Sequence, residues 1–167
     1  SLTHYKGFLR IARSALGPES REIGLASKGI AEIYHERSDL KMALYYYNQA
    51  LDVQRAACGK FSTDVSAILN KFGNLCYEMK DFSTAMKNYA QGLEVERTML
   101  TPCHPHIIIT MTNIAHMHKR LGEHAKALAA YDEVRIMQER TFGFDYIHLA
   151  ETLSSIGLMQ YHLRNFD

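Results

Sequence analysis

Apolar residues recur along the chain at intervals of three and four positions, which is the spacing of one face of an α-helix. One such run carries Leu69, Phe72, Leu75 and Cys76, and a later run carries Met111, Ile114 and Met117. Short polar segments separate the runs, as at Ser38-Asp39 and Lys80-Asp81. The pattern predicts a series of amphipathic helices joined by short turns, in which Ser or Asp begins the next helix.

The helical pattern repeats every 42 residues over nearly the whole chain. Five columns of equivalent positions carry the repeat: Tyr5, Tyr47, Tyr89 and Tyr131; Ala31, Gly73, Ala115 and Gly157; Ala43, Ala85 and Ala127; Ile30, Phe72, Ile114 and Ile156; and Gly17, Gly59 and Gly143, with Thr101 as the exception. Self-similarity at a fixed period is the signature of a repeat architecture. Each unit contains two helical runs, so the repeat predicts helix pairs that must stack to bury their apolar faces.

The small residues suggest how each pair packs. A glycine or alanine in the first helix leaves a hole, and the tyrosine of the second helix, together with the alanine four residues before it, closes the pair. We expect about eight helices in a single domain of residues 1–167. Its parts are the second helix of an incomplete repeat in 1–19, full repeats in 20–61, 62–103 and 104–145, and the first helix of an incomplete repeat in 146–167.

These columns resemble those of the tetratricopeptide repeat (TPR), in which a small residue in the first helix precedes alanine, an aromatic residue and alanine in the second. The segments Ala31…Ala43…Tyr47…Ala50 and Gly73…Ala85…Tyr89…Gly92 carry the resemblance. It implies an all-α fold, a right-handed α-solenoid superhelix of stacked antiparallel helix pairs. HEAT and armadillo repeats have a similar length of about 40–47 residues but lack this signature.

The 42-residue unit is similar to the long repeats of kinesin light chains. The matching segments are Asn113-Ile114-Ala115, Asp81-Phe82-Ser83-Thr84-Ala85, Tyr47 to Val53, Leu16-Gly17-Pro18 and His104-Pro105. This resemblance implies a cytoplasmic adaptor, associated with the cytoskeleton, that binds short acidic peptides carrying one aromatic anchor. Arg135 departs from the pattern, because Leu51 and Leu93 occupy its column.

Composition narrows the classes of partner. The 167 residues are 47% hydrophobic and carry a net charge of +1, which argues against nucleic-acid binding by phosphate neutralisation and against a polybasic membrane anchor. No apolar run approaches the roughly 20 residues of a membrane span. Three cysteines without CxxC spacing favour reduced thiols in the cytosol. Because the chain begins at Ser1 rather than Met, we expect a fragment of a longer protein.

The sequence offers no catalytic constellation, so we expect no enzyme activity, no cofactor and no metal. His116 and His118 are two positions apart on one helix and therefore point to different sides. The segment Cys103-His104-Pro105-His106 has no second ligand pair at zinc spacing. Gly59-Lys60 resembles the end of a phosphate-binding loop, but Gln54 and Phe61 occupy positions that the motif reserves for other residues.

The first helices of stacked pairs line a concave wall in this geometry. We predict peptide-binding residues there, namely Lys28, His35, Asn70, Lys71, Asn74, Tyr77, Asn113, His116, Lys119 and Arg120. The same wall includes Glu32, Thr112, Ser154, Ser155, Leu158 and Tyr161. Asparagine amides pair with both groups of a peptide backbone, and lysine and arginine attract acidic side chains. We therefore expect a protein or peptide ligand with an acidic or aromatic linear motif.

Three other interpretations remain open from the residues alone. In the first interpretation, the wall residues are ordinary solvated side chains. In the second, the chain is a structural scaffold within a larger signalling or enzyme protein and self-associates through its open repeat ends. In the third, it is an accessory region of an enzyme whose catalytic domain lies outside these 167 residues.

Overall fold

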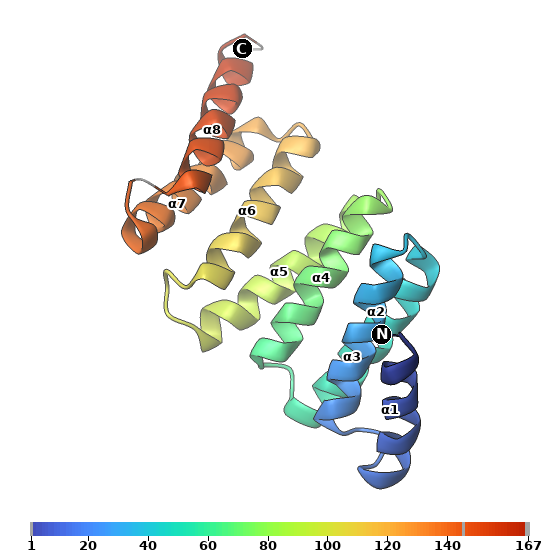
Figure 1. The fold of residues 1–167 in the computed structure, drawn as a ribbon. Helices are drawn as coiled ribbons and strands as arrows, with labels where there is room; N and C mark the ends of the chain where they lie inside the picture. The colour runs from blue at the N-terminus through green and yellow to red at the C-terminus, as the bar shows by residue number, and fades with distance from the viewer. Residues whose placement is uncertain (1, 145, 166–167) are drawn as a thin grey trace. The chain divides into compact units, whose positions relative to one another are not determined.

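A computed structural model describes residues 2–144 and 146–165 of the chain, and every regular element among them is an α-helix (Figure 1). The chain divides into two compact units, whose bounds are residues 1–99 and 100–167. Unit 1 contains α1 (Leu2–Ala15), α2 (Arg21–Glu36), α3 (Leu40–Cys58), α4 (Thr63–Glu78) and α5 (Phe82–Met99). Unit 2 contains α6 (Pro105–Arg120), α7 (His124–Phe142) and α8 (Ile147–Asn165). No described helix is long and apolar enough to cross a membrane.

Tight turns join the two helices of each pair. The residue that reverses the chain has a positive φ at Ser38, Lys80 and Gly122, with values of 60°, 63° and 75°. Asp39 and Asp81 then accept hydrogen bonds from the backbone N–H groups of Met42 and Thr84 at 3.2 and 3.1 Å, as the sequence predicts for caps. The side chain of Thr84 and, to a smaller extent, its backbone N–H lower the pKa of Asp81 by hydrogen bonding to the carboxylate. Only Gly122 adopts the left-handed conformation without the steric cost of a Cβ atom.

The close approach of a tyrosine to a small residue holds each pair together. A Cβ atom placed at Gly73 of α4 would lie only 2.6 Å from Cε1 of Tyr89 in α5, so this position has no room for a side chain. The equivalent tyrosines, Tyr47 and Tyr131, are fully buried. In unit 2, Tyr131 packs in one core cluster with Ala115 of α6. The predicted closure of each pair is therefore seen in both units.

Adjacent pairs are joined by a second set of apolar contacts. In unit 1, Leu9 and Ala12 of α1 pack against Ile23, Ala26 and Ile30 of α2. In unit 2, Ile156 and Met159 of α8 join the cluster around Tyr131 of α7. The second helix of one repeat thus packs against the first helix of the next, which is how stacked repeats bury their apolar faces.

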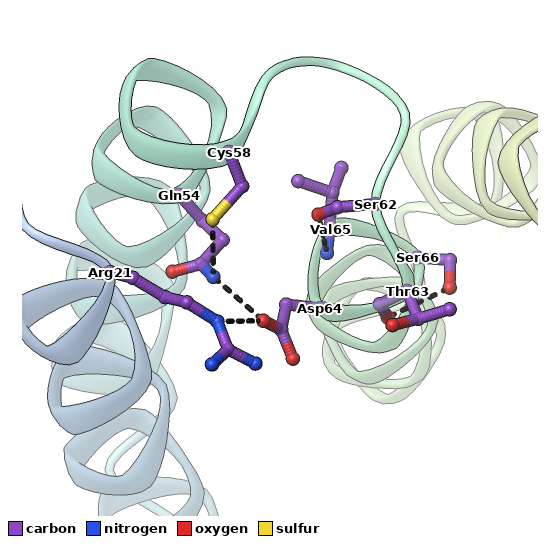
Figure 2. Close-up of polar contacts among 8 residues, drawn as sticks. All are labelled: Arg21, Gln54, Cys58, Ser62, Thr63, Asp64, Val65 and Ser66. Atoms are coloured by element: carbon purple, nitrogen blue, oxygen red, sulfur yellow. Dashed lines mark hydrogen bonds and ion pairs between the residues drawn. The ribbon is translucent and has the colours of Figure 1, made fainter.

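A buried polar column accompanies the apolar core. Gln54, Glu96 and Gln138 occupy the same repeat position in α3, α5 and α7, and none exposes more than 3% of its surface. Figure 2 shows Gln54, whose Nε2 donates to Oδ2 of Asp64 at 3.0 Å. The amide of Gln54 also lies against Gly24 of α2. Arg21 of α2 also donates to Oδ2 of Asp64, at 2.7 Å. A single carboxylate at the start of α4 therefore ties together α2, α3 and α4.

The Asp64 contact should matter for stability because it satisfies a buried amide. We expect Asp64→Ala to lower the free energy of unfolding of the chain by about 1–3 kcal/mol, since an unsatisfied buried donor carries its full desolvation cost. Urea denaturation followed by circular dichroism measures the change. Asp52→Ala, at an exposed position of α3, is the matched control and should change stability little. Equal effects of the two substitutions would show that Asp64 does not join the helices.

Candidate functional site

The first helices of unit 1 form a charged face, called here the α2–α4 face. Its residues are Lys28, Glu32 and His35 of α2 with Lys71, Asn74, Tyr77 and Glu78 of α4. Nζ of Lys71 lies 3.7 Å from Oε1 of Glu32, and Nζ of Lys28 lies 4.0 Å from the same oxygen. Nε2 of His35 lies 2.9 Å from Oε2 of Glu78. The structure therefore places the predicted Lys28 and Lys71 around one carboxylate and pairs the predicted His35 with Glu78.

Asn74 connects the α2–α4 face to the core. The hydroxyl of Tyr89 donates to Oδ1 of Asn74 at 2.7 Å. Burial raises the pKa of Tyr89 well above its usual value, so this hydroxyl stays protonated as a donor. In unit 2 the same columns hold Tyr131 and His116, whose rings lie 5.7 Å apart. The buried tyrosine thus reaches the same wall position in both repeats and fixes the side chain there.

Asn70 lies differently from the other predicted residues of α4. Its Nδ2 donates to Oε1 of the buried Glu96 in α5 at 2.8 Å, so this side chain points toward the second helix of its own pair. Asn70 therefore joins the buried polar column rather than the α2–α4 face. The ring of Tyr77 lies 5.7 Å from that of Phe82, near the turn between α4 and α5.

Unit 2 contains a pocket between its two first helices, called here the α6–α8 pocket. Its volume is about 250 Å³. The lining residues are Ile108, Ile109, Thr112, Asn113 and His116 of α6, Tyr131 and Gln138 of α7, and Tyr146, His148, Glu151, Thr152 and Ser155 from the α7–α8 connection and α8. Two predicted residues, Asn113 and His116, line it. Lys119 and Arg120 follow on α6 but do not line the pocket.

The base of the α6–α8 pocket is polar and fixed. Thr152 and Gln138 are buried, and the hydroxyl of Thr152 donates to Oε1 of Gln138 at 2.9 Å. Since that bond uses the carbonyl oxygen of Gln138, its amide nitrogen remains a donor for other groups. Tyr131 lies behind these groups, fully buried, and the partly exposed Tyr146 provides the aromatic surface. A ligand in this pocket would meet both an aromatic wall and oriented polar groups.

Aromatic rings from the α7–α8 connection form one side of the pocket. The ring of Tyr146 stacks on Phe142 with centroids 4.2 Å apart and meets His148 edge-on at 5.2 Å. Nδ1 of His148 lies 3.2 Å from Oε2 of Glu151. Our sequence analysis did not select Tyr146, His148, Glu151 or Gln138. Of these four residues, only Gln138 could have been noticed in the sequence. Like Gln54 and Glu96 at the same repeat position, it is a polar residue on the apolar face of its helix.

The remaining histidine, cysteine and acidic side chains of the described residues form no metal site. No group of three or more His, Cys, Asp or Glu side chains able to hold a metal ion occurs among the described residues. Cys76 is buried, and burial raises the pKa of its thiol to about 11, so it remains protonated and unreactive. Cys58 and Cys103 are partly exposed and free.

Packing of His116 beside Tyr131 has a testable electrostatic consequence. Although part of the residue is exposed, loss of water around the ring lowers the pKa of His116 below 6.5, and the charge of Lys119 adds to the effect. The unfolded state therefore binds the proton first, so the His116 contribution to stability is present above about pH 6.5 and declines as pH falls.

We expect the free energy of unfolding to fall less between about pH 7.5 and about pH 5 in His116→Gln than in the unsubstituted chain. Titration of the His116 ring by NMR should give a midpoint below about 6.5, the value of an unperturbed histidine. A midpoint above about 6.5 would contradict the assignment.

Comparison with known proteins identifies the repeat. The family model described as tetratricopeptide repeat matches residues 1–56 and 23–97, and a second model with the same description matches residues 108–145. A search of the curated proteins finds no match.

Solved structures of several proteins share the fold. BtubC (BKLC) from P. vanneervenii matches with a TM-score of 0.78 and 21% identity over 87% of this chain, which spans 58% of that protein's chain. A kinesin light chain with nearly identical TPR-like repeats from Podosopora anserina, described as putative, matches with a TM-score of 0.82 and 12% identity, covering 99% of this chain and 78% of the other. RapI in its apo form matches with a TM-score of 0.77 and 17% identity, covering 99% and 59%. The predicted all-α solenoid class is confirmed.

Proposed function

Because the chain belongs to the tetratricopeptide repeat family, whose members are protein-interaction modules, we propose that it is a non-catalytic adaptor that binds an acidic linear peptide with an aromatic anchor. The peptide lies along the first-helix surfaces of the repeats. Each unit offers the peptide a surface of its own, the α2–α4 face in unit 1 and the α6–α8 pocket in unit 2.

The α6–α8 pocket is the observation that carries this proposal. A volume of about 250 Å³ is on the scale of one large side chain rather than of a metabolite with several rings. Ile108, Ile109 and Tyr146 offer apolar contact, while Asn113 and Gln138 offer amides. An aromatic side chain would bury its ring against the former, and the adjoining peptide backbone would pair with the latter.

The exposed lysine of the α2–α4 face supports an acidic ligand. Lys28 and Lys71 both lie beside Glu32, and with Glu78 included the two lysines and two glutamates of this face balance, so an acidic group reaches Lys71 in competition with Glu32. Lys71 leaves 53% of its side chain exposed, which makes it the more accessible of the two cations. In unit 2, Lys119 and Arg120 add positive charge to α6 beyond His116. Charges in such positions steer an acidic partner and favour it over a basic one.

Fold similarity is consistent with this assignment. The Podosopora anserina protein that shares the fold is described as a kinesin light chain, which supports an adaptor that works in the cytoplasm at the cytoskeleton. The three unpaired cysteines agree with a reducing compartment. Affinity should be moderate, because a flexible peptide loses conformational entropy on binding.

Charge reversal on the first helices should weaken binding without unfolding the chain. We expect Lys71→Glu and Lys119→Glu each to weaken an acidic, tryptophan-containing peptide roughly three- to tenfold at low salt, and less at high salt. Fluorescence anisotropy of a labelled peptide chosen from an array of acidic and aromatic motifs measures the affinity. Lys87→Glu, at an exposed position of the second helix α5, is the matched control and should bind normally.

A second peptide, in which alanine replaces tryptophan, separates the contribution of the pocket to affinity from that of the charges. Ser155→Phe, which fills the α6–α8 pocket, should abolish the preference for tryptophan while leaving the salt dependence intact. Unchanged affinity in Lys71→Glu, Lys119→Glu and Ser155→Phe alike would remove the first-helix surfaces as the binding site.

A further inference from the structure

A cationic groove lies between α1 and α3, the second helices of two successive repeats in unit 1. Its volume is about 340 Å³, and we call it the α1–α3 groove. The lining residues are Lys6, Leu9, Arg10 and Arg13 of α1 with Tyr45, Tyr46 and Gln49 of α3. Three of these residues carry a positive charge and none carries a negative charge.

The next two second helices, α3 and α5, show that this surface is open between complete repeats. Asn48 and Asp52 of α3 hold the repeat columns of Lys6 and Arg10, and both are exposed although second helices precede and follow α3 in the same unit. Exposure is therefore a property of these columns. The charge is not, because an amide and a carboxylate replace two of the cations in the later repeat.

The third column shows which way these side chains point. Arg55 of α3 is equivalent to Arg13, and its Nη2 donates to Oε1 of Gln91 in α5 at 3.1 Å. Gln49 of α3 is the equivalent of Gln91 and lines the α1–α3 groove. The column thus faces the second helix of the following repeat, which places the cations of α1 toward α3.

The arginines of the α1–α3 groove have no carboxylate of their own. Lys6, Arg10 and Arg13 are spaced by four and three positions, so they lie on one side of α1, a helix without an acidic residue. Arg10 and Arg13 are exposed, and neither guanidinium forms an ion pair or a hydrogen bond with a described residue. Both retain all their donors for an external anion.

The lysine is held in place by an aromatic cluster. Nζ of Lys6 donates to the hydroxyl of Tyr34 at 2.9 Å and lies 5.4 Å from the centroid of that ring. Tyr34 stacks on Tyr46 with centroids 5.6 Å apart, and Tyr45 meets Tyr46 edge-on at 5.1 Å. The α1–α3 groove therefore has an ordered aromatic wall opposite its two arginines.

We propose that the α1–α3 groove binds a phosphorylated side chain of a partner protein. The planar guanidinium groups of Arg10 and Arg13 match the oxygens of a phosphoryl group, which carries a charge close to −2. Lys6 supplies a third positive charge. Since no carboxylate lines the groove, the phosphoryl group displaces no internal partner of the arginines.

The number of cations favours a single phosphoryl group over a polyanion. Membrane-binding polybasic segments carry clusters of about four to eight lysines and arginines, whereas this groove contains three. Affinity for nucleic acid depends on neutralising many phosphates, and the whole chain has a net charge of only +1. One phosphorylated side chain satisfies three cations in a volume of about 340 Å³.

This site is independent of the peptide surfaces proposed above. It lies on second helices and shares no residue with the α2–α4 face or the α6–α8 pocket. Loss of one activity therefore leaves the other testable. The arginine variants described below should bind the acidic, tryptophan-containing peptide normally.

Phosphorylated peptides test the proposal on the full 167-residue chain. The probes are two versions of one short, otherwise uncharged peptide, with a single phosphoserine or a single phosphotyrosine. Fluorescence anisotropy at low salt should show that at least one of them binds about tenfold or more tightly than the unphosphorylated peptide. A glutamate at the same position should bind more weakly than the phosphorylated residue, because a carboxylate carries one charge and fewer acceptor oxygens.

Neutral substitutions identify the groove. We expect Arg10→Gln and Arg13→Gln each to weaken the phosphorylated peptide roughly three- to tenfold, and the double variant to abolish the preference for it. Lys87→Gln, which removes an exposed charge of α5 outside the groove, is the matched control and should bind normally. Circular dichroism should show all variants folded, since the substituted positions are exposed.

Four results would overturn the proposal. The first is that neither phosphorylated peptide binds better than the unphosphorylated one, and the second is that the double arginine variant binds them unchanged. The third is displacement of the peptide by an equal concentration of inorganic phosphate, which would make the free anion the ligand. The fourth is that phosphatidylserine vesicles, and not the phosphorylated peptides, retain the chain through these arginines.

Discussion

The structure depends on one close contact, in which a tyrosine of the second helix packs onto a small residue of the first. Because no Cβ atom fits between Gly73 and the ring of Tyr89, the axes of α4 and α5 can approach closely only while that position stays small. The same contact, with alanine in place of glycine, recurs at Tyr131 and Ala115. It turns one face of each first helix inward and leaves the opposite face available for ligands.

The tyrosine also contacts side chains of the candidate site from within the core. Its hydroxyl in α5 holds Asn74, and its ring in α7 lies beside His116. The buried polar column has a similar double role, since Gln54 ties neighbouring helices through Asp64 while Gln138 forms the base of the α6–α8 pocket. Groups that hold the helices together are therefore the same groups that position the binding surfaces.

The periodic part of this architecture was predictable from the sequence, because steric demands repeat with the helices. The small residues and tyrosines marked each helix pair, and the aspartates at 39 and 81 marked where second helices begin. The orientation of single side chains was less accessible. Asn70 differs from Asn74 by one helical turn, yet it points toward the buried Glu96. The pocket residues Tyr146 and His148 belong to or adjoin a connection without periodicity, so no pattern marked them.

The glycines at positions 73 and 157 provide the most direct measurement of the central contact, because they occupy the same repeat column with and without a tyrosine opposite. Replacing a helical glycine with alanine by itself stabilises a helix by about 1 kcal/mol. We expect Gly157→Ala to show that gain, and Gly73→Ala to lose stability because overpacking costs about 1–3 kcal/mol. Urea denaturation followed by circular dichroism compares the two variants with the unsubstituted chain. Stabilisation by both substitutions would contradict the account, since the tyrosine contact would then not require a small residue.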